Sequence, residues 1–297
     1  MRLFIIFSLL FLGFHGNTFA QTEQDSVAVT ETLSQSDAKI DLHLNFSVGD
    51  QYRYTTDYSQ NIVQEIMGSS IEIRQQMTTD YHYEVESNAG EEIKIKVSYE
   101  RLQVNLEAPQ GSFNFDSENP QQDDKLAKLS NVIDKPFYIY MNSEGKVTRV
   151  EDYDQLLEGL ELDNAIKDIL SDSMLMNSVD MNIYAPQPVG MGESWNKSRS
   201  YGLGNLQLNS NLTYTLEGVS EDLAWLNVSG DISAIGSQEA YDMEFTGKQT
   251  GTLETDINTG MISSGDVQMD IDAVIKSQGF EIPMKMNANI RMSGTKL

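Results

Sequence analysis

The sequence predicts a mainly β protein, in which antiparallel meanders form curved sheets or open half-barrels. Stretches in which every second residue is apolar recur along most of the chain, and turns rich in Gly and Asn separate them. Such alternation indicates strands with one buried face and one solvated face. The 297 residues include no cysteine. The fold must therefore be held together by a buried core rather than by disulfides.

The N-terminus has the pattern of a secretory signal peptide. A single Arg2 precedes an apolar run, which is followed by a polar segment that closes on Thr18-Phe19-Ala20. The run is about a dozen residues long, short of the ~20 that span a bilayer, which disfavours the alternative of a membrane anchor. We expect residues 1–20 to be removed and the protein to be periplasmic or extracellular. With no cysteine at the cleavage point, it should carry no lipid anchor.

The mature chain is predicted to contain two β repeats. Residues 21–41 are polar and have no period, which is typical of a flexible leader. The first β repeat is expected over residues 42–150. Its alternating runs cover residues 42–48, 52–58, 71–85, 93–99, 102–106 and 137–141, with a polar loop, FDSENPQQDDK, before the last.

Between the repeats, the period of the apolar residues becomes helical. Asp152 and Gln155 resemble a capping box, and the apolar positions that follow lie on one face of a helix. We therefore expect a helical connector over residues 151–184, packed on the sheet.

The second β repeat, expected over residues 185–297, echoes the first. The stretch from Tyr81, YHYEVESNAGEEIKIKVS, aligns without a gap with the stretch from Leu212, LTYTLEGVSEDLAWLNVS. Gly49 aligns with Gly192, and Gly145 with Gly260. Matched segments in the same order indicate a duplication, whereas any two meanders share alternation by chance.

Composition excludes some partners. The formal charge of −25 comes from 45 acidic and 20 basic residues, and it repels phosphate backbones and anionic lipid headgroups. We expect no nucleic-acid partner. The mature chain has only His43 and His82, both within strand patterns, and it has no GxSxG motif. The sequence therefore predicts neither an enzyme nor a cofactor.

Acidic side chains offer weak calcium candidates. They lie in the polar loop and along one strand, and no EF-hand spacing is present. A solvated surface is the simpler interpretation, so no metal is predicted. The residues are Asp116, Glu118, Asp123, Asp124, Asp266, Asp270 and Asp272.

Methionines at alternate positions form the most distinctive pattern. Methionine is a weak strand former, but its unbranched, polarizable side chain adapts to ligands of irregular shape. The simpler interpretation is that most of the stripe is core packed against the connector helix, and that only part of it lines a cavity. If it lines a site for an apolar ligand, the binding residues are Met243, Phe245, Met269, Met284, Met286 and Met292.

Several stretches together resemble a known family. They are the signal peptide, VGDQYRYTTDYSQNIVQE, FNFDSENPQQDD and YMNSEGKVTRVEDYDQLLE. The chain resembles an uncharacterised family of secreted Bacteroidota proteins, known only as a domain of unknown function. Its plan also looks like that of open-barrel carriers of lipoproteins and lipids. Ser26 and Ser173 lie in tripeptides similar to an O-glycosylation sequon of those bacteria.

We therefore expect a non-enzymatic exported protein that binds a hydrophobic ligand, a lipid or a partner protein. A structural or adhesive module of the cell envelope is the alternative, and an enzyme comes third. A cavity along the methionine stripe would favour the first function. An exposed aromatic patch would favour the second, and a cleft that joins a histidine to a carboxylate would favour the third.

Overall fold

The computed structural model of the chain describes residues 39–66, 68–109, 111–119, 127–158, 175–176, 179–203, 206–238, 241–277 and 279–297. In these residues strands dominate, as the sequence predicts. The strands are β1 (Gln51–Ile66), β2 (Ser69–Asn88), β3 (Ile93–Ala108), β4 (Gly111–Asp116), β5 (Pro136–Met141), β6 (Val147–Glu151), β7 (Ser194–Leu203), β8 (Leu206–Ser220), β9 (Leu223–Gln238), β10 (Tyr241–Asp256), β11 (Ile262–Ser277) and β12 (Phe280–Lys296).

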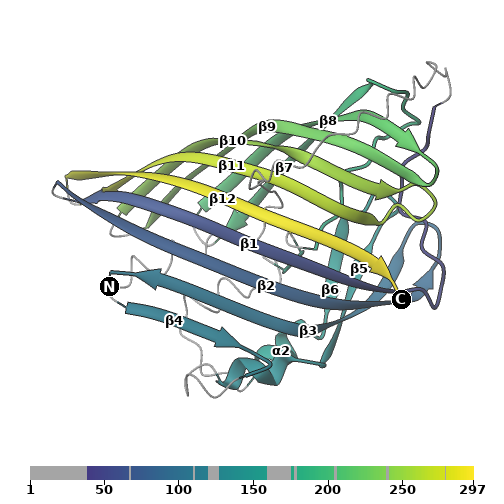
Figure 1. Ribbon diagram of the computed structural model, residues 1–297, viewed down its shortest axis with the longest axis horizontal. Helices are drawn as coiled ribbons and strands as arrows, with labels where there is room; N and C mark the ends of the chain where they lie inside the picture. Colours follow the sequence, from purple (N-terminus) through teal and green to yellow (C-terminus); the bar gives the residue numbers. More distant parts are fainter. Residues whose placement is uncertain are drawn as a thin grey trace, which may run out of the picture.

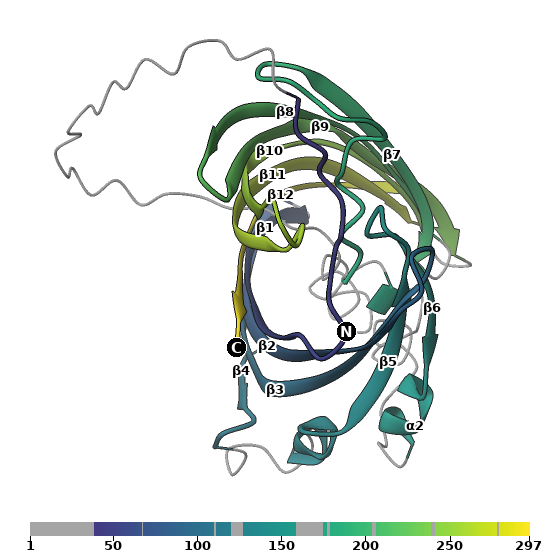
Figure 2. The same cartoon turned by 90° about the vertical axis from the view of Figure 1, so that its right-hand side faces the viewer.

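All twelve strands belong to one antiparallel sheet (Figure 1). Its order is β6-β5-β3-β2-β1-β12-β11-β10-β9-β8-β7, and β4 pairs with β3 beside β5. The first and last strands of the chain thus meet in the middle, where Tyr52 lies opposite Lys296. The sheet curves but does not close, because β6 and β7 form its two open edges (Figure 2).

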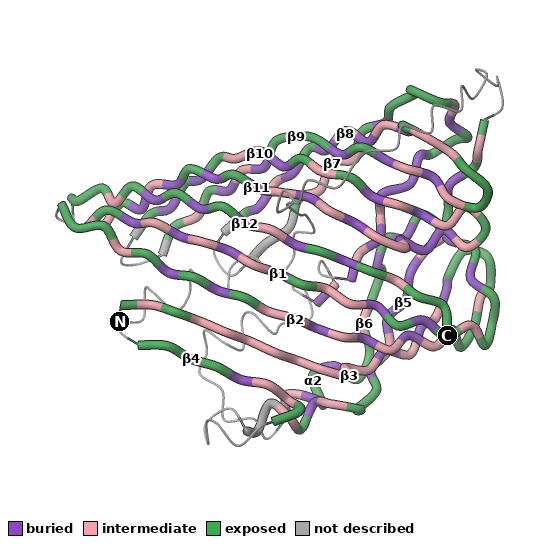
Figure 3. Tube along the Cα trace, viewed as in Figure 1, coloured by how far each residue is buried: buried purple, intermediate pink, exposed green. Residues whose placement is uncertain are grey.

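Burial alternates along the strands (Figure 3), and the face that the sequence predicts to be buried on β12 is the buried one. Met284, Met286 and Met292 are buried there, whereas Asn287 between them is exposed. This register follows from the two-residue period of a strand, since a shift by one residue would exchange the faces.

The predicted strand over residues 42–48 is wrong. Its alternate residues Leu42, Leu44 and Phe46 are buried, but the segment pairs with no neighbouring strand. Its backbone instead bonds to two turns, since the Leu44 N–H donates to Ser143 O and the Asn45 N–H to Thr259 O, both at 2.9 Å. It crosses the inside of the curved sheet, dark purple in Figure 2.

The described helical residues form the 3₁₀ helix Ala127–Val132 and α2 (Tyr153–Leu157), and Leu175 and Met176 are helical as well. The predicted capping box does not form. Gln155 donates to the Asp152 carboxylate at 2.8 Å, but that carboxylate bonds no backbone N–H of the helix. Tyr153 and Leu156 of α2 are buried. Residues 159–174 of the expected connector lie outside the described residues. No described helix is long and apolar enough to cross a membrane.

Corresponding hydrogen bonds occur in the two aligned halves. Gly49 N–H donates to Val85 O at 2.9 Å, and its counterpart Gly192 N–H donates to Leu216 O at 2.7 Å. Both glycines have positive φ. The ladders also shift register after Val85 and after Leu216, at equivalent places in the β2–β3 and β8–β9 pairs. These matched features favour a duplication, whose exact boundaries stay a prediction.

The larger of two buried clusters lies where loops enter the curve, and we call it the aromatic cluster. Tyr54, Tyr83 and Phe137 belong to it, as do segments that are not strands. These segments cover the buried face of the sheet, so this end of the molecule has a conventional filled core. The members outside the strands are Leu42, Leu44, Phe46, Val132, Tyr153, Leu156, Leu175, Val179, Met181, Ile183, Tyr184, Ala185, Val189 and Met261.

Candidate functional site

The second buried cluster contains most of the methionine stripe, and we call it the methionine cluster. Five of the six predicted binding residues belong to it, each at most 3% exposed. The strands bring these residues together, since Met269 lies opposite Ala288 and Ile271 opposite Met286. Its members are Tyr58, Ile62, Ile73, Leu208, Ile232, Ala234, Met243, Phe245, Met269, Ile271, Ala273, Ile275, Met284, Met286, Ala288 and Ile290.

Met292, the sixth predicted residue, belongs to the aromatic cluster instead. The Tyr54 hydroxyl donates to its sulfur at 3.1 Å. Met286 and Met292 share a strand and a face, yet they pack in different clusters. The methionine stripe is therefore continuous in the sequence, but its residues pack in two different environments in the structure.

The two clusters differ in what packs on the sheet. Loop and helix residues contribute to the aromatic cluster, whereas every member of the methionine cluster lies on a strand. Within the described part of the chain, no non-strand segment belongs to the methionine cluster. At this end of the sheet, the described residues that pack on the apolar face therefore all come from strands.

A row that contains glutamines crosses the buried face within the methionine cluster. Gln60 on β1 lies opposite Gln75 on β2 and opposite Ala288 on β12. The row continues through Met269 on β11 to Gln249 on β10. All five residues are buried, at most 4% exposed. We call Gln75, Gln60, Ala288, Met269 and Gln249 the glutamine row.

Hydrogen bonds order one end of the glutamine row. The Tyr58 hydroxyl donates to Gln60 Oε1 at 2.6 Å, and Gln60 Nε2 donates to Gln75 Oε1 at 2.8 Å. Burial raises the pKa of Tyr58 well above its usual range, so the phenol keeps its proton and acts as donor. Four residues further towards the tip of the β1–β2 hairpin, Gln64 Nε2 donates to the Met284 sulfur at 3.4 Å.

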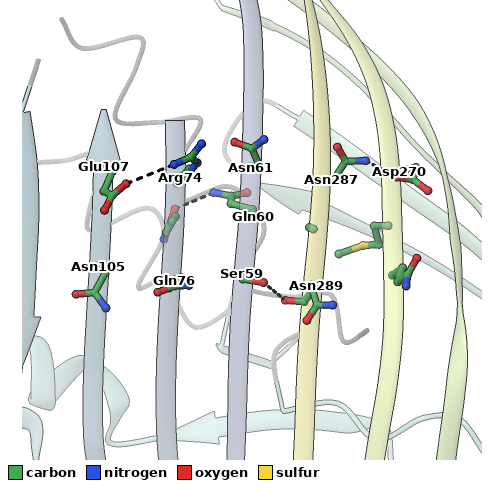
Figure 4. Close-up of a pocket in the computed structure, with 14 residues that line it drawn as sticks. Ser59, Gln60, Asn61, Arg74, Gln76, Asn105, Glu107, Asp270, Asn287 and Asn289 are labelled. Atoms are coloured by element: carbon green, nitrogen blue, oxygen red, sulfur yellow. Dashed lines mark hydrogen bonds and ion pairs between the residues drawn. The ribbon is translucent and has the colours of Figure 1, made fainter. Parts of the chain in front are cut away.

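A pocket of about 430 Å³ borders the glutamine row (Figure 4). Gln60, Gln75, Met269 and Ala288 line it together with exposed or half-exposed polar side chains of the same strands and of β3. The latter form two transverse rows, one with Ser59 and Asn289 and one with Arg74 and Glu107. A second pocket, of about 600 Å³, touches Phe245, Ala273 and Met284 of the methionine cluster, beside exposed charged residues. Most lining residues of both pockets lie on the exposed face of the sheet, on the side opposite the methionine cluster, so neither pocket shows a cavity along that cluster.

The acidic candidates for calcium have protein partners where they are described. Asp116 pairs with Arg101 at 2.9 Å, and this cation lowers the pKa of Asp116. Asp270 accepts a hydrogen bond from Asn287, and Asp272 lies 3.3 Å from Lys285. Asp123, Asp124 and the sequon serines Ser26 and Ser173 lie outside the described residues. Among the described residues, no group of three or more His, Cys, Asp or Glu side chains could hold a metal ion.

The two histidines lie outside the buried face. His43 Nδ1 is 3.5 Å from the Asp41 carboxylate, and both side chains are roughly half exposed or more. His82 is half-buried on β2, opposite Arg53 of β1. Neither histidine contributes to the methionine cluster or to the glutamine row.

Sequence reasoning missed the glutamine row, although a signal for it was present. In the stretch YSQNIVQ, Gln60 and Gln64 occupy the same alternate positions as Tyr58 and Ile62. Their strand face is buried, so these glutamines are buried too. A polar residue at an apolar phase of the alternation is therefore the pattern that would have found them.

A family model matches residues 90–262, which is more than half of the 297-residue chain. The chain belongs to DUF6263, a family of unknown function. The matched part runs from the turn before β3 to the start of β11 and includes Met243 and Phe245. The resemblance to an uncharacterised family is thereby confirmed, while its source group stays a prediction. No curated protein matches the sequence.

Among solved structures, the fold is similar to that of lipovitellin, in a structure described for its lipid–protein interactions. The TM-score is 0.50 at 10% identity, over 84% of this chain and 25% of that chain. The chain thus spans a quarter of that protein's length, and the likeness is one of fold. An outer membrane channel from Pseudomonas putida F1 matches at a TM-score of 0.21, with 6% identity over 85% of this chain and 97% of that chain. The NalP translocator domain from Neisseria meningitidis matches at 0.23, with 7% identity over 83% and 90%.

Proposed function

We propose that this protein is a non-enzymatic binder of lipid, which it holds against the buried face of the sheet at the methionine cluster. The observation that carries the proposal is the composition of that cluster. All of its members lie on strands, whereas the aromatic cluster also contains loop and helix residues. An apolar face of this kind, rich in unbranched methionine, suits acyl chains of variable shape.

Two further observations support a lipid. The fold resembles that of lipovitellin, whose structure is described for its lipid–protein interactions. The buried polar side chains of the described residues are all uncharged, so the interior suits a ligand with long apolar chains. They are Gln60, Gln64, Gln75, Thr79, Ser210, Gln249 and Thr255.

The competing proposal, a structural or adhesive module, has less support. Such a module needs an exposed apolar or aromatic patch for its partner. The large exposed apolar side chains of the described residues include a single aromatic one, Phe280. The others are Val48, Met191, Ile235 and Leu297. They lie on β9 and in separate turns or at the C-terminus, which is the scattered exposure of an ordinary surface.

A matched pair of methionine truncations tests the lipid proposal. We expect Met292→Ala to lower the free energy of unfolding by ~2–5 kcal/mol, because it opens a void in a filled core. Met286→Ala should cost less than Met292→Ala and should change the affinity for an apolar fluorescent probe. Urea denaturation and probe titration measure the two properties for each variant.

Asn287→Ala serves as the control, because Asn287 lies between the two methionines on the exposed face of β12. It should alter neither the stability nor the probe affinity by much. Native mass spectrometry of the purified protein should also show co-purified lipid. Probe binding that is absent in the wild type, or equally unaffected by Met286→Ala and Met292→Ala, would reject the lipid proposal.

We also propose that the protein is exported and that its mature chain begins at Gln21. The support is the short apolar run followed by Thr18-Phe19-Ala20. N-terminal sequencing of the protein recovered from cells should therefore begin at Gln21. A chain that retains residues 1–20 would contradict both the processing and the predicted location.

A further inference from the structure

The end of the glutamine row leaves one buried hydrogen-bond donor unused. Tyr58 has a single hydroxyl proton, and it donates that proton to Gln60 Oε1. This bond fixes the Gln60 amide, whose Nε2 then donates to Gln75 Oε1. The hydrogen bond from Gln60 thereby sets the orientation of the Gln75 amide. Gln75 Oε1 accepts that bond, and Gln75 Nε2 is directed away from Gln60.

Gln75 Nε2 is buried and has no acceptor within hydrogen-bond distance among the described residues. The side chain is only 2% exposed, so bulk water does not compensate. A buried donor without a partner destabilises a protein, and most such groups in native structures are paired. Its position beside the methionine cluster suggests that a bound molecule supplies the missing acceptor.

The surroundings of Gln75 restrict what that acceptor can be. Its neighbours across the ladders are Gln60 on β1 and Leu106 on β3, and the buried polar side chains of the described residues carry no charge. An ionised carboxylate would lose its hydration here and gain no counter-charge. A neutral carbonyl oxygen accepts the same hydrogen bond without that penalty.

We propose that Gln75 binds the carbonyl of an uncharged acyl lipid, an ester, whose chain lies along the methionine cluster. This inference rests on the proposed function, and it adds a chemical class to it. Gln75 would act as the residue that distinguishes an ester from a hydrocarbon of the same length. The Tyr58–Gln60 pair would act only by orienting the Gln75 amide.

Three pyrene-labelled probes of the same chain length test the inference. They are a dodecane, the methyl ester of dodecanoic acid, and dodecanoic acid in its ionised form. The wild-type protein should bind the ester roughly tenfold more tightly than the hydrocarbon, as one added hydrogen bond predicts, and the acid more weakly than the ester. Gln75→Leu should bind ester and hydrocarbon equally. Gln75→Met, which keeps the unbranched shape, replaces it if the leucine variant does not fold.

Thr79→Val is the matched control. Thr79 is 1% exposed on the same strand and face, and its hydroxyl also lacks a partner among the described residues. Its variant should keep the preference for the ester. The readout is a ratio of two affinities, so the loss of stability expected when Gln60 loses its acceptor does not imitate the effect.

The outcomes separate this inference from the lipid proposal. If the wild type binds none of the three probes, the lipid proposal itself fails. If it binds them but has no preference for the ester, or if both Gln75 variants keep that preference, the role of Gln75 is wrong and the lipid proposal stands. Tighter binding of the ionised acid would also overturn it, because the site would then accept a charge.

Discussion

Tyr184→Ala should lower the free energy of unfolding by ~3–5 kcal/mol, the range for truncating a large aromatic side chain in a packed core. Tyr184 is fully buried in the aromatic cluster, in the segment that leads to β7. Its hydroxyl donates to the carbonyl oxygen of Gly260, in the turn between β10 and β11. Tyr184 therefore links the segment that leads to β7 to the turn between β10 and β11. Urea denaturation gives the free energy.

Two control variants help to assign the loss of stability in Tyr184→Ala. Tyr184→Phe keeps the ring and removes only the hydrogen bond to Gly260, so it should cost about 1–2 kcal/mol. Gln187→Ala changes an exposed residue three positions further on and should be nearly neutral. A loss below ~1 kcal/mol for Tyr184→Ala would mean that this segment is not part of the cooperative core.

The sequence predicted the strand faces well, because burial alternates with the same period as the side chains. The methionines of β12 that the sequence places on the buried face, Met284, Met286 and Met292, are buried in the structure. The order of the strands was beyond such reasoning. β1 pairs with β12 across nearly the whole chain, and no local pattern encodes a partner so distant in sequence.

Alternation also led to a wrong prediction at residues 42–48. The pattern reports that one face of an extended segment is buried, but it does not report where the backbone hydrogen bonds go. In the structure, Leu44 and Asn45 bond to turn residues rather than to a neighbouring strand. The segment fills the curve from within instead of extending the sheet.

The candidate site was only half predictable. The methionine stripe was visible because apolar residues at alternate positions are the expected mark of a buried face. The glutamine row was not, because Gln60 and Gln75 read as polar surface until their strand phase is considered. The separation of Met292 from Met286 depends on which segments pack against each, and that is set by contacts between residues far apart in sequence.

Gly260→Ala should be among the most damaging single substitutions in the chain. Gly260 has φ of +74°, and a Cβ added there would lie 2.1 Å from the carbonyl oxygen of His43. Both the left-handed backbone and the contact with the segment around His43 exclude a side chain. The backbone of that segment would have to move, although its neighbours Leu42 and Leu44 are fixed in the aromatic cluster.

Gly279→Ala is the matched control, because Gly279 has nearly the same φ, +81°, and nothing lies within 4 Å of its added Cβ. It should cost ~1–2 kcal/mol from the backbone conformation alone. Gly260→Ala should cost ~1–3 kcal/mol more, the usual penalty for overpacking, and the difference between the two variants isolates the close approach to His43. Chemical denaturation of both variants measures that difference. Equal losses would show that the segment around His43 yields freely, and the inward course of residues 42–48 would then contribute little to the stability of the sheet.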